Sequence, residues 1–77
     1  MSFDREDFAG NLRSLRARKN LTQAAVAEAA RINAASLSNF EKGLTIPNLE
    51  TVCALADFYG VSLDQLTFYG DRPKGRE

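Results

Sequence analysis

The sequence repeats one helix-start signal along its length, and this signal constrains the fold more than any other feature. At each occurrence, a residue suited to cap a helix N-terminus precedes a stretch in which apolar side chains recur at helical spacing. In most cases apolar residues also stand just before the cap and four positions into the helix, where they can pack together as a hydrophobic staple. The caps are Asp4, Thr22, Asn33, Asn48 and Ser62. Five short helices are therefore expected, and the predicted fold class is all-α.

Stop signals give each helix an expected extent. Glycine supplies a left-handed stop at Gly43 and at Gly60, and Ser62 and Gln65 have the spacing of a capping box. No stretch shows the period-2 alternation typical of a strand. We expect the first four helices to end at about Lys19, Ala30, Lys42 and Tyr59. Residues 4–68 are then one ordered domain, and residues 69–77 are a flexible C-terminal tail.

Composition limits the function classes that are open to the chain. With 77 residues, 44% of them apolar and 26% charged, it resembles an ordinary water-soluble domain. The apolar runs are too short for a membrane span or an export signal. Cys53 is the one cysteine and histidine is absent, so the usual metal clusters and nucleophile–base pairs cannot form. We predict a cytoplasmic protein that is not an enzyme, has no membrane association and no cofactor, and shows no evident small-molecule site.

Charge is distributed unevenly although the formal net charge is zero. Residues 10–45 carry six bases against two acids, whereas acids outnumber bases both before and after that segment. A basic central block is typical of a surface that attracts nucleic acid, and it is also typical of an ordinary solvated face. Both interpretations stay open on charge alone.

The second and third predicted helices are separated by only about two residues, which requires them to cross steeply, as in a helix-turn-helix. A close crossing needs a small side chain, and Ala27 is placed where the approach is tightest. Around this unit the sequence resembles the Cro/C1-type (XRE-family) helix-turn-helix domain over about residues 8–67. The motifs that carry the resemblance are Leu21-Thr22-Gln23, Val26-Ala27-Glu28, Ile32-Asn33, Leu37-Ser38, Phe40-Glu41-Lys42-Gly43, Ile46-Pro47-Asn48-Leu49 and Gly60-Val61-Ser62-Leu63-Asp64-Gln65-Leu66.

The resemblance implies a five-helix bundle of the lambda-repressor-like type that binds double-stranded DNA and regulates transcription. Its third helix would enter the major groove, and a homodimer would read two half-sites about one helical turn apart. The resemblance places four outward residues of that helix over base edges: Ala34, Ala35, Ser36 and Asn39. Asn39 has the amide geometry for adenine, and the alanine methyl groups suit a thymine methyl. Ser36 and Asn39 are also compatible with an inert surface.

Phosphate contacts are implied at the start of the second helix and around the loop after the third. Gln23 is the first residue of its helix, where free backbone N–H groups and the positive end of the helix dipole favour an anion. Lys42, Thr45 and Asn48 resemble the family's second phosphate clamp. Asn48 is equally explained as a helix cap, and Thr45 as an ordinary loop residue.

Two further positions follow from the family pattern. Arg16 and Glu41 match an arginine of the first helix and a glutamate at the end of the third that the family commonly pairs, so we expect a structural ion pair there. Arg31 stands where the family usually has glycine, in a turn that typically needs a positive φ. The third helix also lacks Lys and Arg between Asn33 and Glu41, which predicts modest affinity and contacts that favour A·T pairs.

Aromatic and apolar residues near the C-terminus exceed what a small bundle readily buries. In this family the fifth helix commonly forms the two-fold contact, so the expected dimer interface includes Leu63, Leu66 and Phe68. Phe68 is equally explained as folding back on its own core. The alternative for the whole chain is a protein-interaction module or antitoxin-like adaptor that keeps the bundle but has little DNA affinity. The neutral net charge and the alanine-rich third helix favour that alternative.

Overall fold

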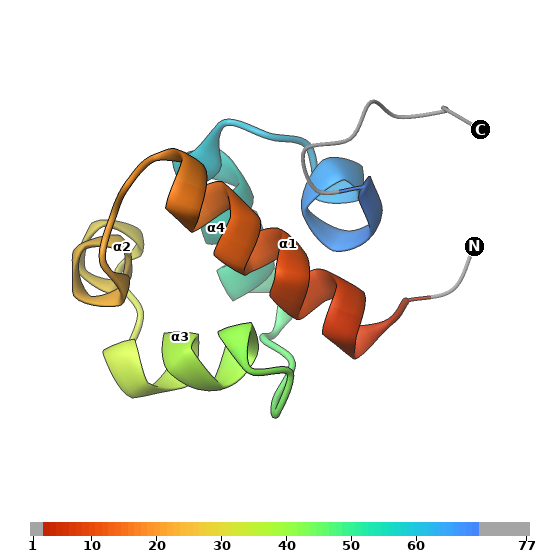
Figure 1. Cartoon of the computed structure of the whole chain (residues 1–77), viewed down its shortest axis with the longest axis horizontal. Helices are drawn as coiled ribbons and strands as arrows, with labels where there is room; N and C mark the ends of the chain where they lie inside the picture. The colour runs from red at the N-terminus through yellow and green to blue at the C-terminus, as the bar shows by residue number, and fades with distance from the viewer. Residues whose placement is uncertain (1–2, 70–77) are drawn as a thin grey trace.

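The computed structural model describes residues 3–69, which form five helical elements and no strand (Figure 1). The all-α prediction is therefore confirmed. The elements are α1 (Arg5–Arg18), α2 (Gln23–Ala30), α3 (Ala34–Glu41), α4 (Leu49–Tyr59) and the π-helix η1 (Gln65–Tyr69). Among the described helices, none combines the length and the apolar character needed to cross a membrane.

Each helix begins at its predicted cap. A side-chain oxygen of the cap accepts hydrogen bonds from backbone N–H groups of the first turn at Asp4, Thr22, Asn33 and Asn48. Before the last helix, Ser62 and Gln65 form the expected capping box, in which each residue's backbone N–H donates to the other's side-chain oxygen at 3.1 Å. These bonds satisfy N–H groups that a helix start leaves without an intrahelical partner.

A residue with positive φ follows each of the four α-helices, and the predicted stops at Gly43 and Gly60 are among them; the other two are Asn20 and Arg31. Gly60, after α4, has φ 69°, which glycine adopts without a steric penalty. Arg31, after α2, has φ 61° and ψ 47°. The turn therefore keeps the left-handed conformation that glycine normally provides, and a residue with a Cβ occupies it.

The last element differs from the regular fifth helix that the sequence predicts. Two backbone carbonyls, one just before η1 and one within it, accept hydrogen bonds from side chains. Thr67 Oγ1 donates to the Leu63 carbonyl at 2.7 Å, and Asn11 Nδ2 of α1 donates to the Leu66 carbonyl at 2.9 Å. The widened π-helical turn coincides with these side-chain bonds, which supply partners outside the regular α-helical pattern. The helix reaches Tyr69, one residue past the predicted domain end, and the rest of the predicted tail, 70–77, lies outside the described residues.

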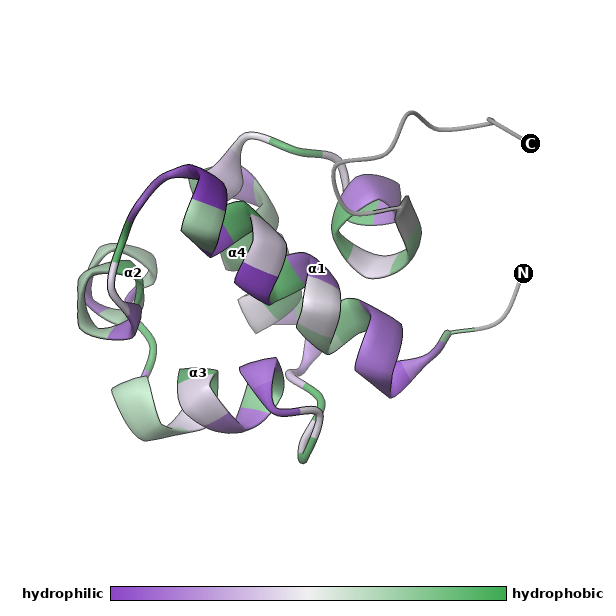
Figure 2. Cartoon of the chain, viewed as in Figure 1, coloured by the Kyte–Doolittle hydropathy of each residue, from purple (hydrophilic) through white to green (hydrophobic). Residues whose placement is uncertain are grey.

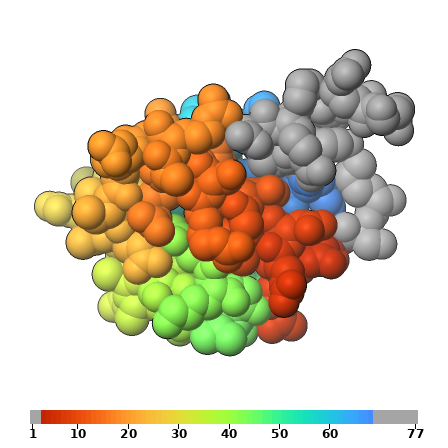
Figure 3. All heavy atoms as spheres, in the orientation of Figure 1, coloured from red at the N-terminus to blue at the C-terminus, as the bar shows by residue number. Residues whose placement is uncertain are grey.

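One hydrophobic core joins all five elements. Its most deeply buried members are Phe8, Leu12, Val26, Leu37, Leu55 and Leu66. Helix α1 packs against η1 and α3, and α2 packs against α3 and α4. Hydrophilic and hydrophobic residues are interspersed along α1, while the residues of α2 are mostly apolar or neutral (Figure 2). Burial of the apolar residues thus fixes α2 and α3 relative to α1, and the remaining sides of these helices form one face of the molecule (Figure 3).

Candidate functional site

Helix α3 lies at the surface with its two sides clearly divided. Leu37 is fully buried and Phe40 is 9% exposed, so these residues hold the helix against the core. On the other side, Ala34 and Ala35 are exposed, and Asn39 is half-buried. Ser36 is half-buried as well, so the predicted outward row is open at the start of α3 and more enclosed toward its end. Helix α2 packs against α3, and Ala27 of α2 is only 3% exposed.

The predicted ion pair is present between α1 and α3. Arg16 Nε donates to Glu41 Oε2 at 2.8 Å and to Oε1 at 3.1 Å, and Arg16 Nη2 donates to Oε1 at 2.9 Å. The hydrogen bond to Glu41 and its negative charge raise the pKa of Arg16, although burial opposes the shift. A forked, charge-assisted contact of this kind is among the stronger polar interactions in proteins.

This ion pair reaches a third helix. Arg16 Nη1 donates to the Leu21 carbonyl at 2.9 Å, just before α2, and Gln23 Nε2 donates to Glu41 Oε1 at 3.0 Å. Glu41 is only 2% exposed. A single buried carboxylate therefore connects α1, the N-terminus of α2 and the last turn of α3. Gln23 is half-buried, and its side chain is engaged inside the protein. All three residues were predicted from the sequence to have a role, but the contact between Gln23 and Glu41 was not predicted.

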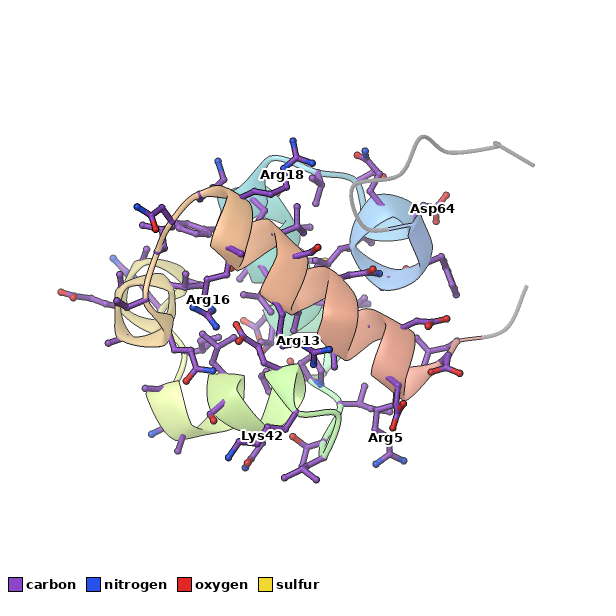
Figure 4. All side chains as sticks on the ribbon, in the orientation of Figure 1. Arg5, Arg13, Arg16, Arg18, Lys42 and Asp64 are labelled. Carbon is purple, nitrogen blue, oxygen red and sulfur yellow. The ribbon has the colours of Figure 1, made fainter. Side chains whose placement is uncertain are left out.

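Basic side chains of α1 support the turn after α3. Arg13 donates to the backbone carbonyl of Glu41, and Arg5 Nη1 donates to the carbonyl of Leu44 at 3.2 Å. Figure 4 shows Arg13 and Arg16 reaching from α1 toward α3, with Arg5 near the start of α1 and Lys42 at the end of α3. Sequence reasoning missed Arg5 and Arg13. The available signal was the row of bases along α1, which by itself is also typical of a solvated helix.

The loop between α3 and α4 carries the remaining predicted phosphate contacts. Lys42, Thr45 and Asn48 are all exposed there. The Asn48 side chain also accepts from the Thr51 N–H at 2.9 Å, so its capping role is real. Lys42 and Arg13 line a shallow hollow of about 190 Å³ together with Glu6 and Ala9. The loop thus combines exposed polar groups with nearby positive charge.

The predicted dimer residues do not form one surface. Leu63 is 41% exposed and Phe68 is half-buried, but Leu66 is fully buried in the core of its own chain. The inclusion of Leu66 in a dimer interface is therefore wrong, because a side chain without exposed surface cannot contact a second subunit directly. The structure also exposes apolar residues that the sequence analysis did not single out, namely Leu44, Ile46 and Leu49.

Potential metal ligands are not grouped together in the described part of the chain. Residues 3–69 contain no group of three or more Cys, Asp or Glu side chains that could hold a metal ion, and Cys53 is an exposed free thiol. The arrangement consists of a displayed helix, a supported helix N-terminus and a polar loop, which together are suited to recognition of an extended partner.

Comparisons with known proteins agree with this arrangement. Residues 7–67 match the family model described as a helix-turn-helix domain. The chain is 41% identical over 68 residues to the HTH-type transcriptional regulator DdrOP3 of Deinococcus deserti, covering 83% of this chain and 53% of that protein. It is 39% identical over 59 residues to the cryptic phage CTXphi transcriptional repressor RstR of Vibrio cholerae, covering 77% and 53% of the two chains. The chain thus spans about half the length of these curated relatives.

A solved structure extends the comparison to three dimensions. The P22 c2 repressor protein, solved in complex with a synthetic operator, superposes with a TM-score of 0.77 and 26% identity, covering 80% of this chain and 94% of that one.

Proposed function

Because the chain belongs to the helix-turn-helix family of Cro/C1-type (XRE-like) regulators, we propose that it binds double-stranded DNA as a transcriptional regulator and places α3 in the major groove. One observation carries the proposal: α3 is held on the surface by Leu37 and Phe40 while the start of its other side stays open. A helix of this diameter fits the major groove of B-DNA. That the P22 c2 repressor was solved with an operator supports the same partner.

Base recognition is proposed for the outward row Ala34, Ala35, Ser36 and Asn39. The Asn39 amide can pair with adenine, Ser36 can donate or accept, and the two alanine methyl groups suit thymine. Helix α3 contains no Lys or Arg, so the arginine fork that reads guanine is missing from it. We therefore expect a preference for A·T-containing half-sites and a contribution from DNA shape.

Phosphate contacts are proposed for Gln23, Lys42, Thr45 and Asn48. The first turn of α2 contains no acidic side chain, and its backbone N–H groups favour an anion. Lys42 supplies a mobile positive charge at the other end of α3. These contacts position the protein on DNA without reading sequence.

The proposed regulator is a homodimer, because a two-fold pair of α3 helices reads two half-sites about 34 Å apart. Leu63 and Phe68 remain candidate contacts for this dimer. The exposed apolar residues Leu44, Ile46 and Leu49 favour the second candidate function, a protein-interaction module with little DNA affinity, since apolar loops of this kind often contact proteins.

Titration of a labelled duplex at several salt concentrations separates these functions. A duplex of about 30 base pairs can hold two half-sites one turn apart. DNA binding predicts a steep, linear fall of log affinity with log salt. Lys42→Ala should lower the magnitude of the slope of log affinity against log salt by about 1. Asn39→Ala should weaken binding and make the protein less selective among bases. Lys19→Ala is the matched control, since it removes an equally exposed charge at the far end of α1. A slope near zero for the unaltered chain would reject the proposal in favour of the interaction module.

A further inference from the structure

We infer that Glu41 is a positioning residue for DNA binding: its buried carboxylate fixes the side-chain amide of Gln23 at the N-terminus of α2 in the orientation that presents an N–H group to phosphate. The inference rests on the proposed function and extends it from the residues that touch DNA to one that does not.

The orientation of the Gln23 amide follows from the chemistry of its partner. An ionised carboxylate only accepts hydrogen bonds, whereas a glutamine amide has an NH₂ group that donates and an oxygen that accepts. The amide must therefore turn its nitrogen toward Glu41 Oε1, and the observed 3.0 Å contact is made by Nε2. Nε2 carries a second hydrogen that this bond does not use. The donor end of the amide is thus fixed beside the first turn of α2.

Glu41 can hold this amide firmly because it is itself held. Both of its oxygens accept from Arg16, and the carboxylate is 2% exposed. Arg16 also donates to the Leu21 carbonyl, so the chain is fixed on the other side of the cap Thr22. The segment that leads into α2 is therefore tied to the same ion pair as Gln23. A side chain restrained in this way loses less conformational entropy when it binds a ligand.

The ion pair also explains how an acidic residue is tolerated near a proposed phosphate site. An isolated negative charge beside phosphate would repel it. Here the Arg16 guanidinium lies against the carboxylate, so the pair presents little net charge. Glu41→Gln keeps the shape of the side chain but removes the acceptor-only character. The Gln23 amide can then turn over and present its oxygen to the phosphate.

A double-mutant cycle on DNA affinity tests the inference. The variants are Gln23→Ala, Glu41→Gln and the combination, each titrated with the labelled duplex at a temperature where circular dichroism shows a folded chain. We expect each single change to weaken binding by about tenfold, the size of one charge-assisted hydrogen bond. In the Gln23→Ala background, Glu41→Gln should cause little further loss of DNA affinity, because the residue that Glu41 positions is missing.

Two further measurements separate positioning from stability. In the free protein, the two Gln23 Nε2 hydrogens should have widely separated NMR shifts that converge in Glu41→Gln. Val52→Ala, a core change on α4, should lower the free energy of unfolding without altering the DNA affinity of the folded chain. If Glu41→Gln weakens binding equally with glutamine and with alanine at position 23, the inference fails while the proposed function stands. If the unaltered chain shows no salt-dependent DNA binding, both are overturned.

Discussion

Replacement of Arg16 by methionine should destabilise the fold far more than loss of a surface charge would. Arg16 contributes three hydrogen bonds to the Glu41 carboxylate and one to the Leu21 carbonyl. Methionine fills a similar volume but donates none of them, so Arg16→Met leaves a 2% exposed carboxylate with Gln23 as its remaining side-chain donor. Breaking a fully buried pair by removing one partner typically costs about 3–5 kcal/mol. Because the Arg16 side chain is 24% exposed, the expected loss is near the lower end, about 3 kcal/mol.

This magnitude is large for a chain of 77 residues. Domains of that size have a free energy of unfolding of about 4–11 kcal/mol, so the variant would lose roughly a quarter or more of its stability. Since 1 kcal/mol shifts the melting temperature of such a domain by about 4–8 °C, the expected fall in Tm is at least about 12 °C. Urea unfolding followed by circular dichroism at one pH gives the free energy directly.

Two companion variants decide whether the ion pair is the cause. Arg16→Lys keeps the positive charge but cannot make the forked contact of a guanidinium with a carboxylate. Its loss of unfolding free energy should therefore lie between zero and the loss of the methionine variant. In the combination Arg16→Met with Glu41→Met, the stranded charge is gone, and much of the stability should return. If Arg16→Met lowers the free energy of unfolding by less than about 1 kcal/mol, the reasoning is refuted, because a fully exposed ion pair contributes that much. A double variant that is no more stable than Arg16→Met alone would also refute it.

Two other changes have expected outcomes in unfolding experiments. Arg31→Gly should raise the free energy of unfolding by up to about 1 kcal/mol, because relief of the left-handed strain outweighs the added freedom of the unfolded chain; a loss of stability would show that the turn is not strained. Burial raises the pKa of Tyr59 to about 12, and its hydroxyl has no hydrogen-bond partner in the described structure. Because the pKa is higher in the folded state than the unfolded value of about 10, the stability that Tyr59 contributes is complete below pH 10 and is lost as the pH rises toward 12, by about 1.4 kcal/mol per unit. Tyr59→Phe should lose less stability between pH 10 and pH 12 than the unaltered chain does. An identical loss in the two proteins would contradict this account.

The helix starts were predictable because the physics that sets them is local. A cap such as Asn33 accepts from N–H groups two and three residues later, so its partners lie within the same short stretch of sequence. The same holds for Ser62 and Gln65. The left-handed turn at Arg31 was expected only from the family pattern, which usually has glycine at this position, and Arg31 has φ 61°.

Contacts between distant residues were predictable only where the family pattern supplied them. The pair of Arg16 and Glu41 was expected from that pattern, but the bond from Gln23 to Glu41 depends on how steeply α2 crosses α3, which no local rule fixes. The error at Leu66 has a different origin. Leu66 stands four positions after the cap Ser62, where the residue of a hydrophobic staple packs inward, so its side chain was not available for a surface role.

The neutral net charge does not weigh against DNA binding once the positions of the charges are considered. Exposed charges act over about one Debye length, roughly 8–10 Å in physiological salt, so only charges near the phosphates matter. Glu41 is neutralised by Arg16, and the acids Glu6 and Asp7 lie in the first turn of α1, where the helix dipole stabilises them. Figure 4 shows Arg13 and Arg16 between α1 and α3, with Lys42 at the end of α3 and Arg5 near the start of α1, and we call the surface at these four residues the basic edge. The salt dependence of binding should therefore follow the local charge of the basic edge, and substitutions elsewhere that change the net charge by the same amount should leave the slope unaltered.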